Sequence, residues 1–145
     1  RFSMIHSDGY IDRASSDLQS AYMSAAYYSK KDIFKAIVML GNEKTYQAWY
    51  GVPKEMLNTD RTYNPAGEIY DANGKLLGYY ANQTDNYRQD YYQLHYAHQF
   101  SKSLNMATAA FLTRGIGYYE SYKNNQKFAK YGMSDTLIDG ATVKY

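Results

Sequence analysis

Apolar and polar side chains alternate along four long stretches of the chain, and a period of two predicts β-strands rather than helices. The clearest stretch is IFKAIVML, where one face carries Phe34, Ala36, Val38 and Leu40. The same alternation predicts strands over residues 18–28, 33–50, 87–100 and 105–120. In the first of these, Ala, Met and Leu also suit a helix, but paired tyrosines and three serines weaken that alternative.

The connections between these strands are unequal in length. The segments SKKD and SKSLN are short, whereas residues 53–86 form a long loop in which Asn73-Gly74 predicts a hairpin over 67–80, with a type I′ turn. Short turns at one end and long loops at the other are typical of outer-membrane β-barrels. Four strands cannot close a barrel, which needs about eight. We therefore expect an all-β fold of antiparallel up-and-down strands that forms an arc of a large transmembrane β-barrel, as one partial barrel domain over residues 1–145.

Composition narrows the function. The chain has 145 residues, the size of one domain, and 19 of them are Tyr. The net charge of +2 gives no reason to expect nucleic acid as a partner, because phosphate binding needs a concentrated basic face. The absence of Cys excludes disulfides and thiol catalysis. No apolar run approaches the length of a membrane helix, which leaves strands as the only way to span a bilayer.

Candidate chemistry is sparse. On a strand, His95 and His98 point to opposite faces and cannot share one metal ion. The segment that begins at Asp71 resembles an EF-hand loop, but the required Glu at its twelfth position is Asn82. No GxSxG, HExxH or P-loop pattern occurs, and nothing in the spacing of the scattered acidic residues selects a catalytic pair. We expect no enzyme activity, no catalytic residue, no metal site and no cofactor.

Aromatic residues gather where strands end and long loops begin. Trp49 is the only tryptophan, and it can serve as a core residue, a ligand platform or a marker of the membrane surface. Packing in the wall and loops outweighs ligand contact for most of these rings. A soluble β-sandwich that binds carbohydrate on a tyrosine platform is the main alternative. In a sandwich a second sheet covers the apolar faces, whereas in a barrel they meet lipid.

Several long blocks resemble one known family. SDGYIDRASSDL, EKTYQAWYGVP, RTYNPAG, TDNYRQDYYQLHY and GYYESYK are similar, in this order, to the barrel of TonB-dependent outer-membrane receptors of Bacteroidetes-type bacteria. The resemblance extends to about Lys123 and is specific for the family rather than for a substrate. It implies a barrel in the bacterial outer membrane with a plug domain inside, and energy delivered by TonB through the plug region.

The resemblance also implies partners and contact residues. Such receptors take up scarce nutrients, typically an iron–siderophore, haem or cobalamin, and in other branches glycans or peptides. We expect the chain to be a central barrel segment of a longer protein, in contact with outer-membrane lipid, the plug and the remaining strands, without the plug itself. The candidate contacts for a small nutrient ligand are Trp49, Tyr50, Tyr79, Tyr80, Tyr118 and Tyr119.

Overall fold

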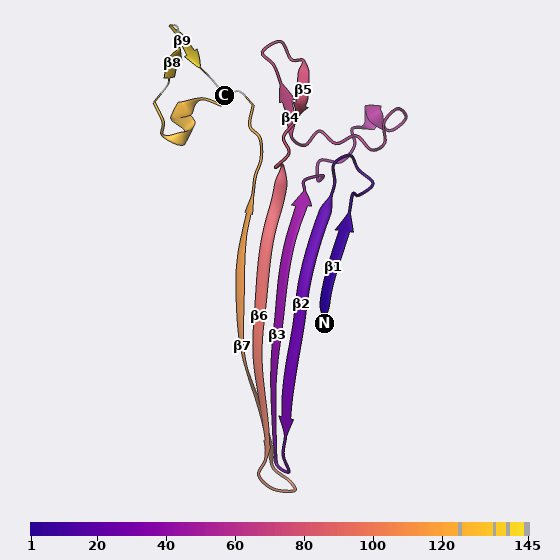
Figure 1. Cartoon of the computed structure of the whole chain (residues 1–145), viewed down its shortest axis with the longest axis vertical. Coiled ribbons are helices and arrows are strands. Elements are labelled where there is room, and N and C mark those ends of the chain that lie inside the picture. The colour runs from indigo at the N-terminus through magenta and orange to yellow at the C-terminus, as the bar shows by residue number, and fades with distance from the viewer. Residues whose placement is uncertain (125, 135, 139, 144–145) are drawn as a thin grey trace.

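A single antiparallel sheet dominates the computed structural model, which describes residues 1–124, 126–134, 136–138 and 140–143. Its strands run up and down in the order β1-β2-β3-β6-β7 (Figure 1). Their bounds are Phe2–Ser7 for β1, Ser16–Tyr28 for β2, Asp32–Tyr46 for β3, Thr84–Gln99 for β6 and Asn105–Tyr119 for β7. The expected all-β fold with antiparallel up-and-down strands is confirmed.

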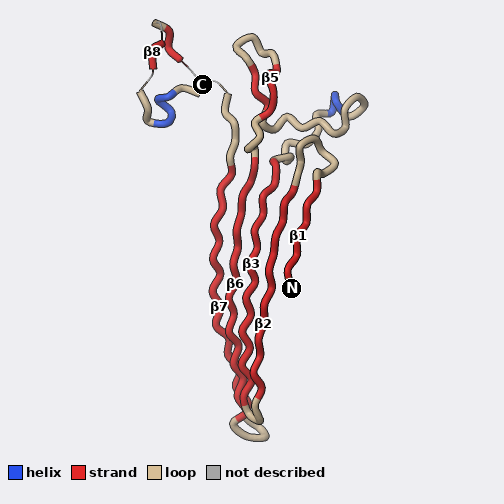
Figure 2. The backbone as a smooth tube through the Cα atoms, viewed as in Figure 1, coloured by secondary structure: helices blue, strands red, loops and turns tan. Residues whose placement is uncertain are grey.

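Smaller elements lie in the connections beyond one end of the sheet (Figure 2). They are the 3-10 helices η1 (Lys54–Met56) and η2 (Phe128–Tyr131), the hairpin of β4 (Glu68–Tyr70) and β5 (Leu76–Tyr79), and the hairpin of β8 (Thr136–Ile138) and β9 (Ala141–Val143). In the described part of the chain, no helix is long and apolar enough to cross a membrane.

The strand register sorts the side chains into two unlike faces. Phe34 pairs with Tyr27 on one side and Tyr96 on the other, and residues paired in this way share a face. The apolar face carries, on the four long strands, Met23, Ala25, Phe34, Ala36, Val38, Leu40, Tyr92, Leu94, Tyr96, Ala110 and Leu112. The opposite face, called the polar face below, is mixed: it carries Ser20, Ser24, Lys35, Gln89, Gln93, His95 and Thr113 together with many apolar side chains, among them Ile37, Met39 and Phe111.

The five strands form one layer, and the tertiary contacts of the long strands are with their neighbours in the sheet. Among the described residues no second sheet covers the apolar face, so that Leu94 is 53% and Leu112 is 63% exposed. The buried residues instead gather at the end of the sheet that carries the long loops. A hydrophobic core of the usual kind therefore does not hold this sheet together within the described residues.

The strand ends differ from the sequence-based prediction in three places. Strand β1 lies in a stretch for which the alternation predicted no strand, and β2 begins at Ser16 rather than at residue 18. Strand β3 stops at Tyr46 rather than continuing to Tyr50. The N–H of Gln47 still donates in register to the carbonyl of Gln83 at 2.8 Å, but the N–H of Gln83 donates to the carbonyl of Tyr80 instead of returning the bond. The ladder ends there, and Gly51 then adopts a φ of 73°.

The β4–β5 hairpin lies within residues 67–80, but its turn is not the type I′ turn that Asn-Gly favours. Gly74 has a φ of 80°, whereas Asn73 does not have the positive φ that a type I′ turn requires at both central residues. The carboxylate of Asp71 accepts hydrogen bonds from the N–H groups of Asn73 (2.9 Å) and Lys75 (2.8 Å). This local side-chain bonding organises a wider turn in place of the tight one.

Candidate functional site

The loop end of the sheet holds a buried group of residues that we call the loop junction: Tyr46, Gln47, Asn64, Ala66, Gly67, Gln83 and Thr84. Apart from Asp90, these are the buried residues of the described chain. They come from the end of β3, the long loop and the start of β6. The junction therefore fixes the long loop on the wall.

Tyr46, at the end of β3, binds the long loop through its hydroxyl group. Its hydroxyl group lies 3.1 Å from the carbonyl oxygens of both Ala66 and Tyr80, and it donates its single proton between them. Gly67, which follows Ala66, has a φ of 78°, a conformation that side chains disfavour. The N–H of Tyr80 also donates to the carbonyl of Gly67 at 2.7 Å. Both ends of the β4–β5 hairpin are thus held above Tyr46.

Two glutamines link three strand ends. The side-chain amide of Gln47 donates to the carbonyl of Glu120 at 2.9 Å. The amide of Gln83 donates to Oε1 of Gln47 and to Oγ of Ser121, both at 3.0 Å, while its own Oε1 accepts the N–H of Tyr122 at 2.8 Å. Because buried amides are costly when unpaired, this chain of bonds favours one arrangement of β3, β6 and the segment after β7.

Asn64 joins the first loop to the same junction. It is 2% exposed, and its Nδ2 donates to the carbonyls of Asp12 and Gln47, both at 3.0 Å. Its Oδ1 accepts the N–H of Ala66 at 3.0 Å, so all of its polar atoms are used. Asn64 therefore connects the β1–β2 loop, the end of β3 and the long loop through one side chain.

Arg13 extends this link toward the hairpin. It has a φ of 61°, and its guanidinium group donates to the carbonyl of Asn64 and lies 3.5 Å from the ring centroid of Tyr79. A cation over an aromatic face is attracted by the ring quadrupole. The Nε atom of Arg13 is buried without a protein partner among the described residues. Tyr79 is thus committed to a contact within the protein.

Two carboxylates in the loops are bound by tyrosine hydroxyl groups. Tyr63 and Tyr70 donate to the two oxygens of Glu68, at 2.5 and 2.6 Å. Hydrogen bonding to Glu68, followed by burial, raises the pKa of both tyrosines above the ordinary value. Tyr80 donates to Glu120 at 3.0 Å, which in the same way raises the pKa of Tyr80.

The predicted contact residues do not form one cluster. Trp49 and Tyr50 are each 61% exposed in the turn that follows β3. Tyr79 lies under Arg13, and Tyr80 is bound to Glu120. Tyr118 and Tyr119 end β7 on opposite faces, 60% and 67% exposed, with their neighbours across the sheet at Asn86 and Asp85.

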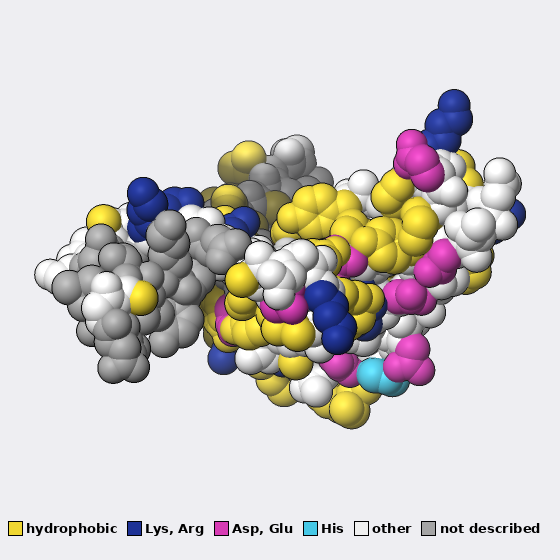
Figure 3. All heavy atoms as spheres, turned by 90° about the horizontal axis from the view of Figure 1, so that it is seen from above, with side chains coloured by type: hydrophobic (Ala, Val, Ile, Leu, Met, Phe, Trp, Pro, Cys, Tyr) yellow, Lys and Arg dark blue, Asp and Glu magenta, His cyan; other side chains and the backbone are white. Residues whose placement is uncertain are grey.

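Tyr80 does have an aromatic neighbour, which the prediction did not include. The ring of Tyr122 lies 6.0 Å from it, between centroids. Together they line an open hollow of about 310 Å³, along with Ser121, Lys123, Gln126, Tyr131 and Met133. Three tyrosine rings with an ammonium and an amide group can bind a flat or ring-shaped polar molecule. The loop end seen from above shows apolar side chains interspersed with charged ones (Figure 3).

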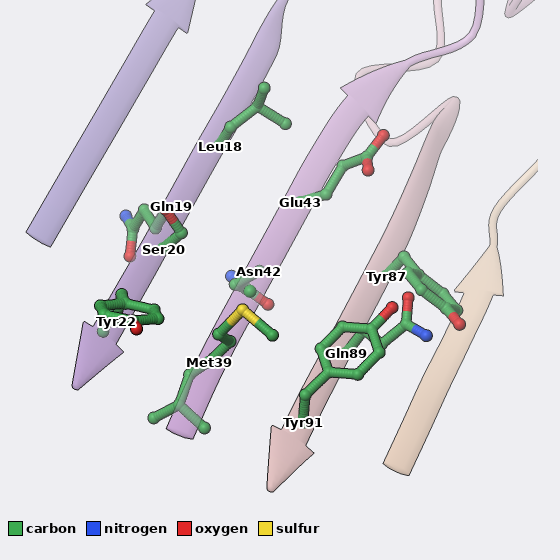
Figure 4. A pocket seen from close by; sticks show the side chains of 13 residues that line it. Leu18, Gln19, Ser20, Tyr22, Met39, Asn42, Glu43, Tyr87, Gln89 and Tyr91 are labelled. Atoms are coloured by element: carbon green, nitrogen blue, oxygen red, sulfur yellow. The ribbon is translucent and has the colours of Figure 1, made fainter. Parts of the chain in front are cut away.

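A second hollow of about 380 Å³ lies mainly on the polar face, below the loops (Figure 4). Ser20, Glu43, Tyr87, Gln89 and Tyr91 line it from three adjacent strands. Tyr87 lies against Gly115 and Gly117 of β7, where the lack of side chains makes room for its ring. Leu18, Tyr22 and Met39 also line the hollow, so the polar face is hollowed here by a mixture of polar and apolar side chains.

The residues with the most contacts were not identified from the sequence. The prediction singled out none of Arg13, Gln47, Asn64 and Gln83, and the hydrogen bonds that they make join residues up to 73 positions apart. His95 and His98 lie on opposite faces, and the described residues contain no group of three His, Cys, Asp or Glu that could hold a metal ion. Comparison with family models, curated proteins and solved structures finds no match to this chain.

Proposed function

We propose that this chain forms part of the wall and the extracellular loops of a TonB-dependent receptor in the bacterial outer membrane, where it takes part in the uptake of a scarce nutrient. The observation that carries the proposal is the single-layer sheet with one bare apolar face and one polar face. A lipid-facing band outside and a polar interior are the arrangement of a transmembrane barrel wall.

The dimensions of the apolar face support this role. From Phe34 to Leu40 the alternating apolar positions span about 20 Å along β3, at about 3.3 Å per residue. On β6 the same face turns polar at Asp90, which pairs with Leu40 at the upper limit of the band, and the next pair on this face, Asn42 and Arg88, is polar on both strands. Since the lipid-facing band of outer-membrane barrels is about 25 Å tall, the band matches one membrane crossing. A β-sandwich would need a second sheet over this face, which the described residues do not provide.

The two ends of the sheet support an orientation. One end carries the turns at residues 29–31 and 100–104, and the other carries the long loop over residues 47–83 (Figure 1). Outer-membrane barrels place short turns in the periplasm and long loops outside the cell. The loop junction holds the outer loop in a fixed position, so that Trp49 and Tyr50 remain exposed for a ligand.

The nutrient class rests on the sequence resemblance and on the side chains at the loop end. We propose an iron–siderophore, haem or cobalamin as the ligand, because these scarce nutrients present flat or ring-shaped polar surfaces to aromatic rings. The partners are then the plug and remaining strands of the receptor, outer-membrane lipid, and TonB acting through the plug region. Energised uptake of the labelled nutrients, with and without TonB, tests this part of the proposal.

Cysteine accessibility tests the orientation. The chain has no cysteine, so a single one placed in it is the only thiol of this segment. In the full-length protein that carries this chain, Lys75→Cys in the β4–β5 turn should react with a membrane-impermeant maleimide on intact cells. Lys102→Cys in the short turn should react only after the outer membrane has been permeabilised.

Detergent-solubilised samples provide the control, because both cysteines are exposed and should then react equally. Reaction of Lys102→Cys on intact cells at the rate of Lys75→Cys would overturn the proposed orientation. Recovery of the protein without detergent, in the soluble fraction, would overturn the membrane role itself.

A further inference from the structure

The short-turn end of the sheet concentrates positive charge. Lys30 and Lys31 lie in one turn and Lys102 in the other, and the N–H of Gln99 donates to the carbonyl of Lys31 at 2.8 Å. This bond holds the turn at residues 29–31 against the start of the turn at residues 100–104, and the two turns lie side by side (Figure 1). The three lysines are exposed and therefore free to bind an anion.

The acidic residue next to the first turn, Asp32 at the start of β3, is already hydrogen-bonded. Asp32 accepts hydrogen bonds from Tyr96 at 2.9 Å and from Ser29 at 3.0 Å, and Nδ1 of His98 lies 2.6 Å from its Oδ1. The carboxylate of Asp32 is therefore occupied by hydrogen bonds to residues of the sheet and of the first turn. The lysines remain available for a ligand from outside the chain.

An aromatic ladder rises from the same end along the apolar face. Phe34 stacks on Tyr96 with 4.4 Å between ring centroids, Tyr96 lies 6.3 Å from His98, and His98 meets Phe100 edge-on at 4.5 Å. Amphipathic rings of this kind favour the headgroup level of a bilayer. Above them Leu94 offers hydrocarbon to the acyl region.

A hollow of about 520 Å³ lies beside the first turn, and its polar lining includes Lys30, Lys31, Asp32, His98, Gln99 and Asn105. Lys102 lies in the neighbouring turn, outside this lining. Met106 and Ala107 contribute an apolar side. We propose that this end of the sheet binds an anionic phospholipid, with the phosphate against the turn lysines and the acyl chains along the apolar face. This inference rests on the proposed membrane role, and it adds a lipid site that the receptor function does not require.

The chemistry selects an anionic lipid over a neutral one. A lysine near an anionic membrane surface strengthens binding roughly five-fold, so three lysines together give roughly 100-fold. The hydrocarbon contacts are common to all phospholipids, whereas the charge contacts distinguish phosphatidylglycerol from phosphatidylcholine. Preference for the anionic headgroup is therefore the property to measure.

The test uses the full-length protein in bilayer nanodiscs made of phosphatidylcholine alone or with added phosphatidylglycerol. Phosphatidylglycerol retained after extraction into detergent is counted by native mass spectrometry. The variant Lys30→Gln/Lys31→Gln/Lys102→Gln should lose the preference for the anionic lipid. The matched control Lys54→Gln/Lys75→Gln/Lys127→Gln removes the same charge at the loop end and should keep it.

The outcomes separate the lipid site from the receptor role. Insertion without any preference for phosphatidylglycerol overturns the lipid site alone, whereas failure to insert in either bilayer overturns the membrane role as well. Equal loss in both triple variants shows that only net charge matters and overturns the site. Displacement of the retained lipid by millimolar inorganic phosphate alone identifies an anion site and overturns the lipid assignment.

Discussion

The hydroxyl group of Tyr46 occupies the space in which a side chain on residue 67 would begin, so that Gly67 is required at that position. A Cβ on Gly67 would also meet Cβ of Gln83 and the carbonyl of Tyr80, both at 3.2 Å. Residue 67 is therefore restricted to glycine for a second, independent reason, because its φ of 78° disfavours any side chain.

Gly67→Ala should therefore destabilise the loop junction by about 2–4 kcal/mol, the sum of a steric cost and a backbone cost. Thermal unfolding, followed by circular dichroism in detergent, measures the change. Gly74→Ala is the matched control, since Gly74 has a φ of 80° and nothing within 4 Å of its Cβ position. It should cost only about 1 kcal/mol. Equal losses in the two variants would show that Tyr46 does not constrain residue 67.

Gln83→Leu should detach the long loop from the wall. The substitution leaves Oε1 of Gln47 and the N–H of Tyr122 without their partner, at about 1–3 kcal/mol for each buried unpaired group. We expect faster hydrogen exchange at residues 47 and 122 and faster proteolysis within the loop. Gln19→Leu, at an exposed position in β2, is the control and should leave both rates unchanged. Unaltered hydrogen exchange in Gln83→Leu would show that the loop junction does not hold the long loop on the sheet.

The Tyr63–Glu68–Tyr70 group predicts instability in alkali. Both tyrosines have a higher pKa in the folded protein than in the unfolded chain, where the pKa is about 10. Their hydrogen bonds therefore contribute fully to the free energy of unfolding below pH 10, and this contribution is lost as the pH rises through the pKa values of the folded protein. The melting temperature should fall above pH 10, and Tyr63 and Tyr70 should be among the groups that ionise late in the tyrosinate absorbance.

Tyr63→Phe checks this assignment, because Phe cannot ionise or donate to Glu68. The variant should lose one late-ionising group from the absorbance titration, and its melting temperature should depend less on pH above 10. A titration curve that differs from that of the native protein only near pH 10 would contradict the hydrogen bond to Glu68.

Trp49→Ala and Tyr50→Ala should weaken nutrient binding without destabilising the protein, because both side chains are largely exposed. Loss of one stacking ring costs about 1 kcal/mol, a roughly five-fold weaker affinity. Tyr79→Ala should instead lower the melting temperature, since it removes the ring beneath Arg13. Ligand titration and thermal unfolding on the same samples separate the two effects. Unchanged affinity in both loop variants would exclude them as contacts.

The long strands of the sheet could be predicted from the sequence, whereas the loop junction could not. Alternation at Phe34, Ala36, Val38 and Leu40 is a local signal, and it predicted the strand and its face. The bond from Gln47 to Glu120 joins residues 73 positions apart, and no local pattern records such a contact. The exit of β3 shows the same limit, since the residues after Tyr46 continue an acceptable strand sequence. The ladder ends because the N–H of Gln83, far along the chain, donates to the carbonyl of Tyr80 rather than to Gln47.

The unpaired edge of strand β7 affects how the protein folds and aggregates. All 15 of its residues are exposed, and only β6 pairs with it among the described strands. Its outer row of N–H and C=O groups is a template for any strand that reaches it first. Folding of this sheet and acquisition of a neighbour are therefore coupled events. In dilute detergent the correct neighbour has to compete with a second copy of the same edge, so we expect aggregation to depend on concentration before it depends on temperature.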